Sequence, residues 1–414
     1  MRSEYRRLRL ACYTGNICMA IVGNLPPLLF LTFRASYGIS YGLLGTLVLV
    51  NFCTQLCVDL LFSFFSHKFN IPKTVRLMPL VAIVGFVIFA LAPLFKGNEY
   101  LALLVGTVVF SSASGLAEVL LSPIIAAIPS KDPDREMSKL HSIYAWGAVA
   151  VIVISSLFLY FVGQSYWQLI VFALLVVPFT SFLLFMGAQI PEMQSPDRTL
   201  NVSAHLKNKT LWISVAAIFL GGVAECTMAQ WASGFLEGAL GIDKIWGDLL
   251  GVAMFALMLG LGRTVYSKIG KNLEAVLLLG SIGATACYFL ATFSSNPAVC
   301  LIACAMTGLC TSMLWPGNLS VASARIPDGG VFLFALMAAG GDLGASFGPQ
   351  MMGAVTDAVA ASPYMNDLAA SLGLSAEQLG MKVGMGISAL LALISVPIFL
   401  YIFLTARAQK TKDQ

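Results

Sequence analysis

The stretch Ala117–Trp146, AEVLLSPIIAAIPSKDPDREMSKLHSIYAW, contains the end of one apolar run, a short charged loop and the start of the next apolar run. Glu118 lies inside the first run, about ten residues, or roughly 15 Å of helix, from its expected end near Ile128. An ionisable side chain at that depth in a bilayer costs about 3 kcal/mol or more and usually has a function. We therefore predict two membrane-spanning helices joined by a loop, with Glu118 facing a water-filled cavity.

The composition excludes a soluble globular protein. Of the 414 residues, 58% are hydrophobic and only 11% are charged, which is too few to cover a soluble protein of this length. The net charge of +4 comes from basic residues in short clusters between apolar runs, so no nucleic-acid partner is expected. The nine cysteines form no C-x-x-C pair and no metal-ligand set, and we expect neither a cofactor nor a metal.

Twelve apolar runs are long enough to cross a bilayer core of about 30 Å as helices. They are continuous rather than alternating, which is typical of helices and not of barrel strands. The runs lie near residues 10–34, 39–66, 73–95, 99–128, 137–162, 164–188, 209–236, 245–267, 272–293, 298–325, 330–358 and 380–406. We predict an all-α membrane protein with 12 transmembrane helices, the first of which is not cleaved.

The distribution of basic residues predicts the orientation of these spans. With the N-terminus placed in the cytosol, twenty of the 24 Lys and Arg residues fall on the cytosolic side. The remaining four, Arg34, Lys96, Lys244 and Lys382, fall on the other side. This asymmetry follows the positive-inside rule, so we expect both termini in the cytosol and the protein in the plasma (inner) membrane.

A polar segment at 189–208 separates six spans from six, and the two sets resemble each other. The fourth span contains Leu121-Ser122-Pro123, and the tenth contains Leu314-Trp315-Pro316. We predict two pseudo-symmetric six-helix halves, 1–188 and 209–414, joined by a cytosolic linker loop at 189–208. This arrangement is that of the major facilitator fold, in which substrate sites lie near the bilayer midplane between the halves.

Three acids are predicted proton-coupling residues because they lie deep within spans. Glu118 is the first, and Glu225 and Asp342 are the others. For the last two, a hydrogen bond between helices is as good an interpretation as a substrate contact. Asp59 lies nearer a membrane end and is expected to hold a loop.

The predicted substrate-binding residues are polar or aromatic side chains placed well inside spans. An indole face beside an amide or carboxylate can bind a sugar ring, although each of these side chains could instead pack within the protein or against lipid. The set is Asn24, Glu118, His141, Tyr144, Trp146, Gln230, Trp231, Trp315 and Asn318.

Several of these positions match a known family pattern. Glu118 followed by Ser122-Pro123, the Gly262-Arg263 pair at the end of span eight, and the glycine-rich run that reaches Gly348-Pro349 carry the likeness. On these residues the chain resembles the fucose–galactose–glucose:proton symporters of the major facilitator superfamily. The resemblance implies proton-driven sugar uptake, with Glu118 in the substrate and coupling role. The first span has Gly23-Asn24 where the best-known member of that family has an acid.

The sequence contains no G-x-x-x-x-G-K-[ST] nucleotide-binding motif and no nucleophile–base arrangement, so it does not predict an enzyme. We expect a secondary transporter that takes up a sugar or a similar small polar solute by alternating access. Its partners would be the solute, a proton or sodium ion and the lipid bilayer, and the protein would be a monomer. A proton-coupled exporter of drugs or metabolites and a sodium-coupled sugar symporter are the alternative interpretations.

Overall fold

The computed structural model describes residues 5–65, 68–129, 133–191, 206–326 and 330–412. Within these ranges every regular element is a helix, as the sequence predicts. The chain divides into two compact units: Met1–Ile39 with Val50–Asp197, and Ser40–Leu49 with Arg198–Gln414. The predicted linker at 189–208 lies largely outside the described residues.

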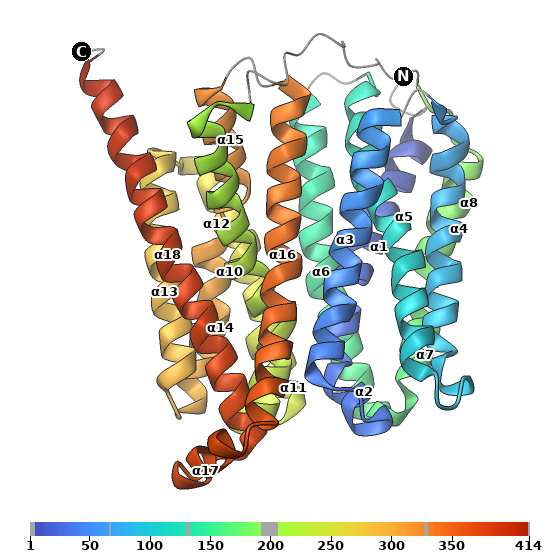
Figure 1. Ribbon diagram of the computed structural model, residues 1–414. Helices are drawn as coiled ribbons and strands as arrows, with labels where there is room; N and C mark the ends of the chain where they lie inside the picture. The colour runs from blue at the N-terminus through green and yellow to red at the C-terminus, as the bar shows by residue number, and fades with distance from the viewer. Residues whose placement is uncertain (1–4, 66–67, 130–132, 192–205, 327–329, 413–414) are drawn as a thin grey trace. The chain divides into compact units, whose positions relative to one another are not determined.

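The long helices of the first unit run side by side (Figure 1). The short α2 follows α1 after a bend of 48°. Pro26 and Pro27 occupy the last turn of α1, where two consecutive prolines remove backbone donors and favour a bend. The helices of this unit are α1 (Arg6–Leu28), α2 (Phe30–Tyr37), α3 (Tyr41–Phe65), α4 (Ile71–Ala90), α5 (Glu99–Ala127), α6 (Pro133–Val162), α7 (Trp167–Leu174) and α8 (Val176–Met186), with short 3₁₀ turns η2 (Ala92–Leu94) and η3 (Gln164–Tyr166). The first turns of α3, up to Leu49, belong to the second unit.

The second unit is also a helical bundle, with one π-helical segment. The tenth predicted span is broken before Pro316, which begins a new helix. The elements of this unit are α10 (Lys209–Leu240), α11 (Lys244–Trp246), the π-helix η4 (Gly247–Ala253), α12 (Met254–Ile269), α13 (Leu273–Phe293), α14 (Pro297–Thr311), α15 (Pro316–Arg325), α16 (Gly330–Ala360), α17 (Pro363–Ser371) and α18 (Ala376–Lys412).

The helices are long and apolar enough to make this an integral membrane protein. Ten candidate spans are present among the described residues, or eleven when the bent pair α1 and α2 counts as one. The 31-residue helix α16 covers the predicted span at 330–358. Each of the twelve predicted runs therefore has a helical counterpart, and the predicted all-α membrane fold is confirmed.

Glycines bring α4 and α5 into close contact in the first unit. A Cβ at Gly85 would collide with the backbone of Phe110, and a Cβ at Gly106 would lie 2.8 Å from the backbone nitrogen of Phe89. Phe86 stacks on Phe110, with the two ring centroids 4.8 Å apart. Small residues thus let the two backbones approach, and the neighbouring rings fill the remaining space.

Helices α10 and α16 approach each other in the same way in the second unit. A Cβ at Gly222 would lie 2.6 Å from the carbonyl oxygen of Gly341, and a Cβ at Gly344 would overlap the carbonyl oxygen of Phe219. Farther along α16, the carboxylate of Asp357 accepts hydrogen bonds from the backbone N–H groups of Tyr41 (3.0 Å) and Gly42 (2.6 Å). The glycine-rich segment of α16 therefore packs closely against α10.

The contact at Gly85 gives a testable consequence. Gly85→Ala should destabilise the protein by about 1–3 kcal/mol, because the added methyl group forces α4 away from α5. The measurement is thermal unfolding of the purified protein. Gly234→Ala is the matched control, since a Cβ there meets nothing nearer than 3.7 Å. A Gly85→Ala melting temperature equal to that of the wild type would contradict this packing.

Candidate functional site

Glu118 lies in the interior of α5, with its side chain exposed. Its neighbours Ala117, Leu120 and Leu121 are buried in the first unit. The carboxyl group therefore points away from the apolar core formed by the rest of that turn. A side chain in this position can exchange protons or contact a solute without the unit unfolding.

A second carboxyl group lies close to Glu118. Asp59 of α3 interacts electrostatically with Glu118, and its Oδ1 is buried with no hydrogen-bond partner among the described residues. The sequence analysis placed Asp59 near a membrane end and expected it to hold a loop, whereas the structure places it beside the most prominent acid of the chain. Asp59 is thus a candidate functional residue that the sequence analysis missed.

Helices α3 and α5 are also joined by buried polar side chains. Ser111 donates a hydrogen bond to Asn51 Oδ1 (2.6 Å), and Ser114 donates one to Gln55 Oε1 (2.9 Å). Gln55 Nε2 in turn donates to Asn51 Oδ1 (3.1 Å). All four side chains are buried, so this network fixes the relative position of the two helices before they reach the acids.

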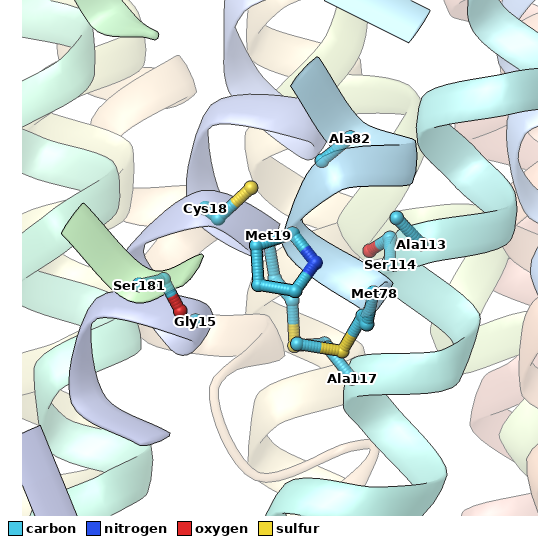
Figure 2. A pocket seen from close by; sticks show the side chains of 10 residues that line it. Gly15, Cys18, Met19, Met78, Ala82, Ala113, Ser114, Ala117 and Ser181 are labelled. Carbon is cyan, nitrogen blue, oxygen red and sulfur yellow. The ribbon is translucent and has the colours of Figure 1, made fainter. Parts of the chain in front are cut away.

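A small cavity lies beside this network in the first unit. Figure 2 shows Met19 and Met78 in its centre, with Ser114, Ala117 and Ser181 around them. Its lining is mostly apolar, and its free space suffices for little more than one water molecule. The cavity is therefore too small for a sugar.

The predicted residues of α1 and α6 are only partly brought together. Tyr144 Oη lies 3.4 Å from the position that a Cβ would take at Gly23, so this hydroxyl is next to Asn24 along α1. Asn24 Nδ2 donates to the carbonyl oxygen of Ala20 (2.9 Å) in its own helix. Trp146 is 65% exposed. The side chain of His141 lies outside the described residues.

One of the two deep acids of the second unit is paired with an arginine, and both act on the same cysteine. Arg263 Nη2 donates to Glu225 Oε1 (3.2 Å), and Arg263 Nε donates to the carbonyl oxygen of Ser312 (3.0 Å). Asp342 is buried, and the thiol of Cys226 experiences the charges of both Glu225 and Asp342. The arginine thus compensates the charge of Glu225 and also connects α12 to the segment after α14.

The remaining predicted binding residues are mostly used inside the second unit. Trp231 is fully buried, and its Nε1 donates to the carbonyl oxygen of Pro349 (3.0 Å). Asn318 is also fully buried, and its Nδ2 donates to the carbonyl oxygen of Ser214 (3.2 Å). Gln230 is buried, whereas Trp315 is partly exposed and packs against Gly341. Of these four side chains, only that of Trp315 remains partly accessible in this conformation.

The described part of the chain contains no group of three His, Cys, Asp or Glu side chains placed to hold a metal ion. The structure brings together the Asp59–Glu118 pair in the first unit and the Glu225–Arg263 ion pair in the second. The sequence identified Arg263 only as part of the Gly262-Arg263 pair of a family pattern, and it predicted that Asp59 holds a loop.

Solved structures of several transporters are similar to this chain. A bacterial homologue of the human lysosomal transporter Spinster gives a TM-score of 0.72 at 15% identity, covering 97% of this chain and 96% of its own. The nucleoside transporter NupG gives 0.71 at 12% identity, covering 95% and 99%. The Escherichia coli fucose:proton symporter FucP gives 0.56 at 14% identity, also covering 95% and 99%. At these identities the similarity shows the fold alone.

The family comparison covers most of the chain. No curated protein matches the sequence. The family model described as Major Facilitator Superfamily matches residues 12–349. Members of this superfamily are transporters built from two six-helix halves, not enzymes. The chain therefore belongs to the Major Facilitator Superfamily.

Proposed function

We propose that this protein is a secondary active transporter that couples uptake of a small polar solute to proton movement by alternating access. The observation that carries the proposal is the exposed carboxyl group of Glu118 in the middle of a membrane-spanning helix, next to Asp59. A carboxyl group in this position can take up a proton and lose its charge. Protonation then changes how strongly the Glu118 carboxyl group binds a solute hydroxyl. It also changes the free-energy cost of exposing this group to lipid.

A sugar, or a solute that contains a sugar ring, is the solute class we propose. Support comes from the resemblance of the Glu118, Gly262-Arg263 and Gly348-Pro349 segments to sugar:proton symporters. Two of the structurally similar proteins are a nucleoside transporter and a fucose:proton symporter, and both of their solutes contain a sugar ring with hydroxyl groups.

The proposed solute contacts follow from which side chains remain accessible. Glu118 and Trp146 are exposed, and Trp315 is partly exposed. Asn24 and Tyr144 are half-buried on α1 and α6, and His141 lies one turn before Tyr144 in the sequence of α6. We propose solute contacts for each unit by itself: in the first unit the residues of α1, α5 and α6 just named, and in the second unit Trp315 more than the buried Gln230, Trp231 and Asn318.

The setting proposed for this activity is the plasma (inner) membrane, with both termini in the cytosol. The lopsided distribution of Lys and Arg supports this orientation. A monomer is sufficient for the activity, since the residues named above all belong to one chain.

The central test of the proposal is Glu118→Gln in the protein reconstituted into liposomes. A thermal-shift screen against monosaccharides and nucleosides first identifies a solute that stabilises the wild type. An imposed inward proton gradient should then drive accumulation of that solute by the wild type. In Glu118→Gln, accumulation should fall to the level of empty liposomes, whereas exchange of labelled for unlabelled solute should continue.

Glu118→Asp serves as the matched control, because it keeps the acid and should retain part of the accumulation. Repeating the accumulation assay with a sodium gradient in place of the proton gradient shows which of the two ions drives uptake. Undiminished accumulation by Glu118→Gln under a proton gradient would rule out the coupling role.

Glu225 is proposed to position Arg263 rather than to carry the proton. Glu225→Gln should therefore keep proton-driven accumulation but destabilise the protein by about 1–2 kcal/mol, because Arg263 loses the charged acceptor of a partly exposed ion pair. Thermal unfolding and the accumulation assay measure the two effects separately. The double variant Glu225→Gln/Arg263→Gln should be less destabilised than the sum of the two single variants. Loss of proton dependence with an unchanged melting temperature would instead identify Glu225 as a coupling group.

A further inference from the structure

We infer that Asp59 and Glu118 together form one binding site for a single proton, and that the polar side chains between α3 and α5 hold these two carboxyl groups near each other. The inference rests on the proposed function, because it assumes that Glu118 is the coupling group, and it adds Asp59 as the second member of the site. It also assigns a positioning role to four residues, which we call the α3–α5 ladder: Asn51, Gln55, Ser111 and Ser114.

The register of the ladder places the two acids opposite each other. Its hydrogen bonds join residues 51 and 111, then residues 55 and 114, so the sequence offset is 60 and then 59. A nearly constant offset at successive turns means that α3 and α5 run in the same direction. One turn farther along each helix lie Asp59 and Glu118, which are also 59 apart. Their electrostatic interaction agrees with this third step of the ladder.

The helices have no room to slide relative to each other at this point. Gly115 lies between Ser114 and Glu118, and a Cβ there would be only 3.1 Å from the Cα of Gln55 and 3.0 Å from the Cβ of Val58. Asn51 and Gln55 are 7% and 8% exposed, and Ser111 and Ser114 are 0% and 4% exposed. A shift of register would break these buried hydrogen bonds without replacing them with water, which is costly.

The two carboxyl groups differ in their exposure, which suits a proton that enters at one group and is shared with the other. Glu118 is exposed and can exchange a proton with its surroundings, whereas Asp59 Oδ1 is buried and has no donor among the described residues. Two adjacent carboxylates repel each other, so a single proton held between them is favoured. A proton taken up from water changes the pair from two negative charges to one, and its release restores both.

Three basic groups on the neighbouring described segments are engaged elsewhere. Arg76 of α4 donates to the carbonyl oxygen of Ala188 (3.3 Å). Arg9 of α1 pairs with Glu136 of α6 (3.4 Å), and Lys139 also contacts Glu136 (3.3 Å). Among the described side chains, Glu118 is the one charged group that acts on Asp59.

The test is a double-variant cycle on the purified full chain, with the proton as the ligand and therefore no need for a known solute. The melting temperature is measured over a series of pH values for the wild type, Asp59→Asn, Glu118→Gln and the double variant. A ligand that binds the folded state shifts its melting temperature, so binding of a proton at the pair makes part of that temperature depend on pH. Glu99→Gln, a change in the first turn of α5, is the control.

We expect each single variant to lose the same pH-dependent part of the melting temperature, and the double variant to lose no more than either one. Glu99→Gln should keep the wild-type pH dependence. The inference is overturned if Asp59→Asn keeps the wild-type dependence, or if the losses of the single variants add in the double variant. It is also overturned if the melting temperature does not depend on pH but rises when sodium replaces choline at a fixed pH.

Variants of the ladder keep the inference testable even if Asp59→Asn does not fold. Ser114→Ala should reduce the pH-dependent part of the melting temperature and change the pH profile of accumulation, and Ser114→Thr, which keeps the donor, should restore both. A Ser114→Ala variant that is only less stable, with an unchanged pH profile, would refute the positioning role. The proposed function fails separately, if Glu118→Gln still accumulates solute under a proton gradient. If only the Asp59→Asn result contradicts the inference, Glu118 remains as a single coupling group.

Discussion

A carboxyl group in the middle of a membrane-spanning helix must be reached by water, paired with a cation or neutralised, and this constraint organises the polar parts of the structure. Glu225 is paired, because Arg263 Nη2 lies 3.2 Å from its Oε1. Glu118 has no such cation among the described residues, and its exposed side chain lies beside a second acid. Glu225 and Glu118 thus meet the same physical requirement in different ways.

The positions of these acids depend on how closely the helices approach. In the first unit, Gly115 lets α3 and α5 come near enough for Ser111 and Ser114 to reach Asn51 and Gln55. In the second unit, Gly222 gives α10 and α16 a similar closeness. Without a hydrophobic driving force between helices in lipid, such contacts and the hydrogen bonds that they permit provide much of the association. The geometry of the charged groups therefore follows from small residues one or two turns away.

The helical membrane fold was predictable, because long apolar runs satisfy their own backbone hydrogen bonds only as helices. The breaks in the first and tenth spans occur at Pro26-Pro27 and before Pro316, which also carry a local signal. Glu118 could be chosen because an isolated acid in an apolar run is visible in the sequence.

Tertiary features could not be predicted from the same information. The proximity of Asp59 to Glu118 depends on the register of two helices whose facing residues lie 59 positions apart, and no local pattern specifies that register. The constant offset of the Asn51–Ser111 and Gln55–Ser114 pairs reveals it only once the helices are packed. The partner of Trp231 was equally hidden from the sequence, since this side chain is fully buried and its Nε1 donates to the carbonyl oxygen of Pro349.

Proton movement during solute influx tests the central claim most directly. In liposomes that contain the protein and a pH-sensitive dye, downhill influx of the solute should acidify the interior when the wild type is present. With Glu118→Gln, labelled solute should still enter liposomes that are preloaded with unlabelled solute, and the interior pH should stay constant. Solute influx through the wild type with no change of interior pH, or continued acidification with Glu118→Gln, would contradict a coupling role for this carboxyl group.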